Sequence, residues 1–179
     1  MTIETALPTH QEAKSALDSL ISTFSDSRLL GETEIKTATL GIAKSVQIRD
    51  YALGALGQSF TATDSLDFVK ALEVLGEVSP ALLAIKAAYY YETEDTIGAN
   101  LALNKALSLD PAHSLSLLLR RVMSAGWPPA SFASMRNELH PKVIEGLKEL
   151  EEVAVNETRS PFRYSFRFRE WRGLGLCTS

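Results

Sequence analysis

The segment from residue 157 to residue 179 concentrates side chains that could contact nucleic acid. It holds five arginines and two glutamates, a formal charge of +3, whereas the other 156 residues sum to −7 within a total of −4. Arginines neutralise phosphates, and aromatic rings stack on bases in single-strand binders. The pattern therefore allows nucleic-acid association through this segment, and its candidate contact residues are Arg163, Tyr164, Arg167, Arg169 and Trp171.

The same segment has a period of two. Aromatic residues occupy the even positions from Phe162 to Phe168, and polar residues occupy the odd ones. Strict alternation is typical of a strand, so we expect a short extended C-terminal segment. Such a strand could pack on the rest of the protein or pair with another chain; a disordered tail is the remaining alternative.

Arg49 and Asp50 are the polar pair that stands out in the body of the chain, because they interrupt an apolar junction between two predicted helices. Removing one partner of a buried ion pair costs several kcal/mol, about 3–5. The pair therefore predicts an ion pair or helix cap that fixes the angle between helices. A ligand-facing arginine is the functional alternative.

Three consecutive tyrosines and one tryptophan are further candidates for contact with a partner. Tyr89, Tyr90 and Tyr91 span about 200° on a helix, so at least one should be buried and one should lie near solvent. Trp127 lies in the break Gly126-Trp-Pro-Pro129. Tyrosine, tryptophan and arginine are enriched at interface hot spots. A small-molecule or regulatory site near Arg49 and the tyrosines is one hypothesis.

The chain contains none of the catalytic patterns that we sought. The three histidines, each expected at a helix start, form no H-E-x-x-H spacing. Glycine-rich phosphate loops and nucleophile elbows are also missing from the sequence. We assign no catalytic residue, no cofactor and no metal ligand, and we expect a protein that is not an enzyme.

Apolar residues recur at helical spacing from Ala13 to Val155, which predicts eight or nine helices. All seven prolines fall at expected helix boundaries, and Pro141 is expected to begin the last helix. The leucine-rich stretch 114–125 is expected to be buried on most sides. The expected helices cover residues 9–27, 32–45, 48–57, 63–78, 80–91, 96–109, 114–125, 131–139 and 141–155.

Composition favours one helical domain, residues 1–156, followed by the basic aromatic segment 157–179. Hydrophobic residues make up 45% and charged residues 22%, as in ordinary globular domains. The longest uncharged run, between Arg121 and Arg136, has 14 residues and is too short to span a bilayer. The first residues resemble no secretory signal, and Cys177 is the single cysteine. We therefore expect a cytoplasmic protein that does not enter membranes.

The hairpin 83–111 resembles one tetratricopeptide repeat. Ala99, Ala106 and Tyr90 fall on the small and aromatic consensus positions, and Leu103 falls on a large apolar one. No second copy lies at the repeat's spacing before or after it, so the resemblance implies a helical pair and not a solenoid. The pair could lack a peptide groove, or it could form a groove that binds a partner.

A second resemblance covers more of the chain. The run 40–50 and the stretch 81–129, which includes Ala102-Leu-Asn-Lys-Ala-Leu-Ser-Leu-Asp-Pro111 and the Gly126-Trp-Pro-Pro129 break, are similar to the C-terminal helical half of the actinobacterial domain-of-unknown-function family 4192. This resemblance implies no known activity.

Together these observations predict an all-α array of antiparallel helix pairs, partly tetratricopeptide-like, with a short extended C-terminal segment. We expect a non-catalytic protein-interaction or scaffolding module with an unidentified protein partner. The alternatives are nucleic-acid association through the C-terminal segment and a small-molecule-binding regulatory domain. The sequence does not reveal the oligomeric state.

Overall fold

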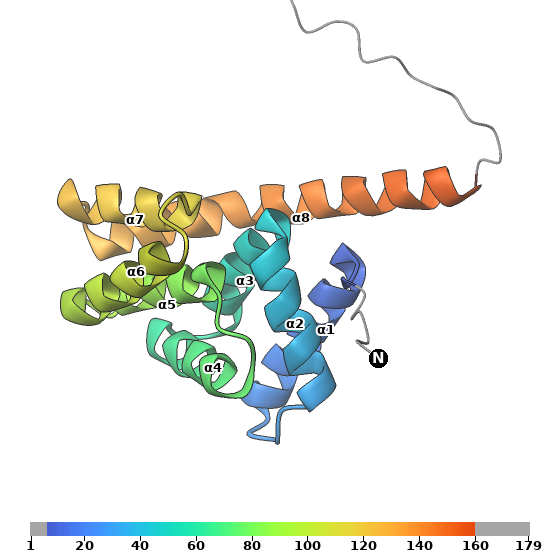
Figure 1. Ribbon diagram of the computed structural model, residues 1–179, viewed down its shortest axis with the longest axis horizontal. Helices are drawn as coiled ribbons and strands as arrows, with labels where there is room; N and C mark the ends of the chain where they lie inside the picture. The colour runs from blue at the N-terminus through green and yellow to red at the C-terminus, as the bar shows by residue number, and fades with distance from the viewer. Residues whose placement is uncertain (1–6, 160–179) are drawn as a thin grey trace, which may run out of the picture.

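The computed structural model describes residues 7–159, and their side chains through Val153, as packed α-helices without a strand (Figure 1). This confirms the predicted all-α class. The helices of the described residues are α1 (His10–Ser25), α2 (Glu32–Lys44), α3 (Val46–Ser59), α4 (Ala62–Leu75), α5 (Pro80–Glu92), α6 (Thr96–Leu109), α7 (Ser114–Ser124) and α8 (Pro129–Arg159).

The helix starts follow local sequence signals. Thr9 and Glu12 form a capping box: the Thr9 backbone N–H donates to the Glu12 carboxylate at 2.8 Å, and the Glu12 N–H donates to Thr9 Oγ1 at 3.2 Å. At α5, the Ser79 side chain accepts from the Leu82 N–H, and Pro80 occupies the first turn. Both helix starts confirm the sequence prediction.

Helix α5 lies at the centre of the described fold (Figure 1). Its most extensive contacts are with α6 and α4, and it also touches α2, α3, α7 and α8. This position explains why α5 is apolar around most of its circumference instead of along one stripe. The remaining large contacts join α1 to α2 and α3 to α8.

The predicted helix boundary at Pro141 is wrong, because α8 runs unbroken from Pro129 to Arg159. A proline inside a helix costs about 3 kcal/mol, since it removes one hydrogen bond and crowds the carbonyl four residues earlier. Pro141 is exposed, so water can solvate that carbonyl. Arg136, His140 and Leu147 are buried on both sides of the proline, and their packing holds the helix together.

The expectation that the leucine-rich helix is buried on most sides is also wrong. Helix α7 buries Leu115, Leu119 and Val122, whereas Leu117 and Leu118 are exposed. It is therefore amphipathic, and part of its apolar surface faces solvent.

No helix among the described residues is both long enough and apolar enough to cross a membrane. The expected extended segment at the C-terminus, with its arginines and aromatic residues, lies outside the described residues.

Candidate functional site

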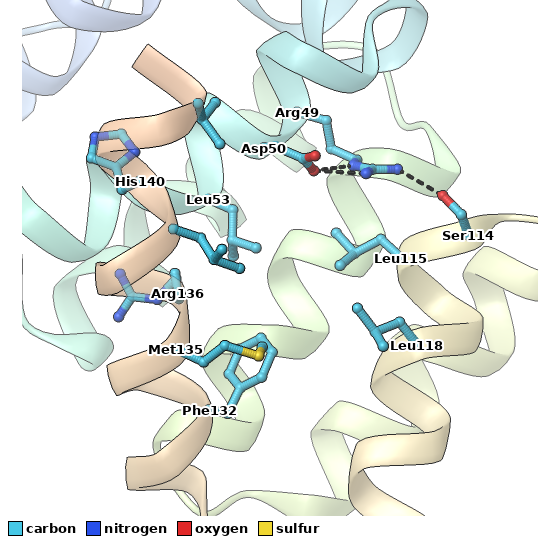
Figure 2. A pocket seen from close by; sticks show the side chains of 12 residues that line it. Arg49, Asp50, Leu53, Ser114, Leu115, Leu118, Phe132, Met135, Arg136 and His140 are labelled. Atoms are coloured by element: carbon cyan, nitrogen blue, oxygen red, sulfur yellow. Dashed lines mark hydrogen bonds and ion pairs between the residues drawn. The ribbon is translucent and has the colours of Figure 1, made fainter. Parts of the chain in front are cut away.

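An apolar cavity of about 210 Å³ lies between α3, α7 and α8 (Figure 2). We call it the α7–α8 cavity. Its mouth is open, because Leu118 of α7 and Leu139 of α8 are 47% and 46% exposed. The other apolar residues of the lining are buried or half-buried: Leu53, Leu115, Phe132, Met135 and Val143. The polar residues of the lining are Arg49, Asp50, Ser114, Arg136 and His140.

Arg49 and Asp50 lie at one end of this cavity (Figure 2). Arg49 is buried, and its Nε and Nη2 atoms donate to Asp50 Oδ1 at 2.8 and 2.6 Å. The pair lies within α3, so the link between helices comes from a third residue. Arg49 Nη1 donates to Ser114 Oγ at 3.2 Å, at the first residue of α7. The guanidinium therefore ties α3 to the start of α7.

A buried ion pair borders the cavity, between α8 and α5. Arg136 Nε and Nη2 donate to the two carboxylate oxygens of Glu92, each at 2.9 Å. The side chains are only 6% and 5% exposed. The Arg136 guanidinium also lies 5.4 Å from the centre of the Tyr89 ring. Bidentate geometry and burial make this one of the strong types of charge-assisted contact.

Two glycines on α3 let α8 approach closely enough for these contacts. A Cβ on Gly57 would lie 1.3 Å from Arg136 Nη1, and a Cβ on Gly54 would lie 2.0 Å from His140 Nδ1. Arg136 and His140 are four residues apart and so share one face of α8. Each polar side chain therefore occupies the space that a larger residue on α3 would fill. Arg136 Nη1 and His140 Nδ1 are both buried, and neither makes a hydrogen bond within the described residues.

The surroundings of His140 favour its uncharged imidazole. Burial lowers the pKa of His140, and the positive charge of Arg136 lowers it further, whereas Asp18 acts in the opposite direction. The imidazole packs 5.5 Å from the Tyr51 ring, between ring centres. Burial followed by the charge of Arg49 also lowers the pKa of His113, at the start of α7.

We predict that stability falls when the pH drops from 7 to 5. A histidine whose pKa is lower in the folded protein than its unfolded value of about 6.5 binds more protons after unfolding. Its contribution is complete above the unfolded pKa and is lost as the pH falls toward the folded pKa. His140→Asn should therefore flatten the plot of unfolding free energy against pH measured by urea denaturation. An unchanged slope would contradict this role for His140.

The structure separates the residues that the sequence singled out. Tyr89 and Tyr91 are buried, with the Tyr89 hydroxyl donating to the Leu53 carbonyl at 2.6 Å and the Tyr91 hydroxyl donating to the Trp127 carbonyl. Tyr90 is partly buried below the ammonium of Lys86, 5.7 Å from the ring centre. None of the three tyrosines lines the α7–α8 cavity.

Trp127 is 47% exposed in the turn between α7 and α8, and it does not line the cavity. The tail candidates lie outside the described residues: Arg163, Tyr164, Arg167, Arg169 and Trp171. Of the predicted set, the structure brings only Arg49 and Asp50 together at the cavity.

Sequence reasoning missed Glu92 and Arg136 and placed His140 at a helix start. The sequence does contain a signal for this contact between helices. Gly54 and Gly57 are one helical turn apart, a spacing that lets a second helix pack against the backbone between them. Arg136 and His140 share the spacing of one turn. The local sequence pattern does not predict that the glycine face of α3 contacts the Arg136 and His140 face of α8, because this contact depends on how the chain folds back.

The geometry of the cavity suits binding of apolar groups. Its charged groups already have counter-charges: Asp50 for Arg49, and Glu92 for Arg136. Within residues 7–159, no group of three or more His, Cys, Asp or Glu side chains is placed to hold a metal ion. An apolar side chain that enters the cavity would exclude water from the exposed side chains of Leu118 and Leu139 at its mouth.

Comparison with known proteins gives one match. A family model described as Domain of unknown function (DUF4192) matches residues 4–130. No curated protein and no solved structure matches the chain. The family match covers α1 to α7 and ends just inside α8.

Proposed function

We propose that this chain, which belongs to the DUF4192 family, is a non-catalytic protein-interaction module that binds an apolar segment of a protein partner in the α7–α8 cavity. The observation that carries the proposal is the open mouth formed by Leu118 and Leu139 over a buried apolar floor. Exposed apolar side chains around a pocket are typical of interaction sites.

The size of the cavity supports a protein side chain as its occupant. A volume of about 210 Å³ suits one or two aliphatic side chains or one aromatic side chain. Binding of a helix through a few apolar anchors in a groove is a common mode of peptide recognition. At one end of the cavity, the partly exposed Asp50 offers a charged rim to such a helix, whereas its partner Arg49 is buried.

Site-specific photo-crosslinking in cells tests this proposal. p-Benzoylphenylalanine is placed at Leu118, at the mouth of the cavity, or at Val74, an equally apolar position that is 81% exposed on α4. We expect discrete protein adducts from position 118 and none of the same mass from position 74. Identical adducts from both positions, or no protein adduct at 118, would exclude the cavity as a protein-binding site.

A further inference from the structure

We propose that the occupant of the α7–α8 cavity is the C-terminal half of α8 from a second copy of this chain, so that two copies form a symmetric antiparallel dimer. This inference rests on the proposed function, because it names the partner that the cavity binds. The inference is based on an apolar stripe that runs along α8 and extends past the other helices.

The stripe continues from the cavity into solvent. Its residues follow one another at three- or four-residue steps, which keeps them on one face of the helix. The first four line the cavity, and the last three lie beyond it. The stripe consists of Phe132, Met135, Leu139, Val143, Gly146, Leu150 and Val153.

The outer half of the stripe has no cover from the other described elements. Leu150 is 39% exposed and Val153 is 56% exposed. A Cβ on Gly146 would meet no atom within 4 Å. The face of α8 that packs on the body is a neighbouring one, where Leu147 is buried and Ile144 contacts the core. Figure 1 shows this end of α8 extending past the other helices.

From Val143 to Val153 the stripe has the four-three spacing of a coiled-coil seam, interrupted by a small residue at Gly146. Val143 and Gly146 bracket the middle of α8 (Pro129–Arg159). A second α8 can therefore lie antiparallel to the first with its Gly146 opposite Val143 of the first. In this register the two helices overlap along their whole length.

In that register, Leu150 of the second copy lies near Leu139, and Val153 lies near Met135. The exposed outer side chains of each copy then fill the cavity of the other. The arrangement is self-complementary, as a two-fold symmetric interface requires.

The charges beside the stripe fit the same register. Lys142 and Glu149 are both exposed and lie seven residues apart on the same edge of the stripe. Antiparallel pairing brings Lys142 of one copy toward Glu149 of the other, and symmetry makes this contact twice. Within one helix the two side chains are about 10 Å apart along the axis, so they pair only between copies.

Light scattering coupled to size exclusion, with sedimentation equilibrium for the dissociation constant, tests the dimer on the purified full chain. We expect a mass of twice 19.6 kDa for the native protein. Leu150→Glu should raise the dissociation constant at least about a hundredfold, because the change acts twice in a symmetric interface that relies on few anchors. Val74→Glu, the same kind of change at an exposed position on α4, should leave the dimer intact.

A charge exchange tests the register. Lys142→Glu and Glu149→Lys should each weaken the dimer, by about threefold to tenfold, and the double variant should restore it. A native protein that remains monomeric, a dimer that survives Leu150→Glu, or a double variant weaker than both single variants would overturn the proposal.

The two proposals fail in different ways. If residues 160–179 of the same chain cover the stripe, the native protein is a monomer and the dimer proposal is wrong. If photo-crosslinking at Leu118 captures only a different protein, the cavity still binds protein and the second copy is excluded. If the crosslinker at position 118 captures no protein, both the protein-binding proposal and the dimer proposal are wrong.

Discussion

Glu92→Gln should lower the free energy of unfolding by about 3–5 kcal/mol, the usual cost of leaving one member of a buried ion pair without its partner. The substitution keeps the shape of the side chain and removes its charge. The Arg136 guanidinium then stays buried against Gly57 and Tyr89 with no counter-charge. Urea denaturation followed by circular dichroism measures the loss.

A second variant and a surface control make this result specific to the buried pair. Replacing both partners, as in Glu92→Gln with Arg136→Met, should cost less than the sum of the single changes, because neither residue is then left charged alone. Glu32→Gln breaks the exposed Lys36–Glu32 pair and should cost no more than about 1 kcal/mol. If Glu92→Gln costs as little as Glu32→Gln, the buried pair does not hold α5 to α8.

Gly57→Ala should destabilise the protein by about 2 kcal/mol or more, although alanine normally stabilises a helix by about 1 kcal/mol relative to glycine. The reason is steric, since the added Cβ would lie 1.3 Å from Arg136 Nη1. Relief requires Arg136 to move, and movement breaks its bidentate contact with Glu92. Thermal and urea unfolding both measure the effect.

Gly146→Ala is the matched control for this substitution, and both changes are compared in the Leu150→Glu background because Gly146 lies in the proposed dimer seam. Gly146 is also inside a helix, but a Cβ there meets nothing within 4 Å. We expect Gly146→Ala to stabilise the protein by about 0.5–1 kcal/mol. Opposite signs at the two glycines would establish that α3 and α8 meet at Gly57. A gain in stability from Gly57→Ala would contradict that contact.

Local features of the fold were predictable from sequence. The start of α5 at Ser79 and Pro80 and the capping box at Thr9 depend only on residues within one turn. The Arg49–Asp50 ion pair is local as well. Its connection to Ser114, 65 positions later, was not predictable, because no periodic pattern relates the two.

The unpredicted features all depend on tertiary packing. Pro141 predicts a helix boundary because proline removes a helical hydrogen bond. Buried contacts of Arg136 and Leu147 nevertheless keep α8 helical through this position. The partners Glu92 and Arg136 are 44 positions apart and meet only because α8 folds back onto α5 and α3. The α7–α8 cavity could not be located for the same reason. The family match gives no function, so the function proposed here depends on the geometry of this cavity.

The methyl group of Met135 offers the most direct test that a protein segment enters the α7–α8 cavity. Met135 lines the cavity, whereas Met123 packs against the core elsewhere and serves as an internal reference. In protein labelled with ¹³C at its methionine methyl groups, we expect the Met135 resonance to shift as the chain concentration rises and the Met123 resonance to stay fixed. A Met135 resonance that is unchanged by concentration, and by any protein captured at position 118, would contradict the account.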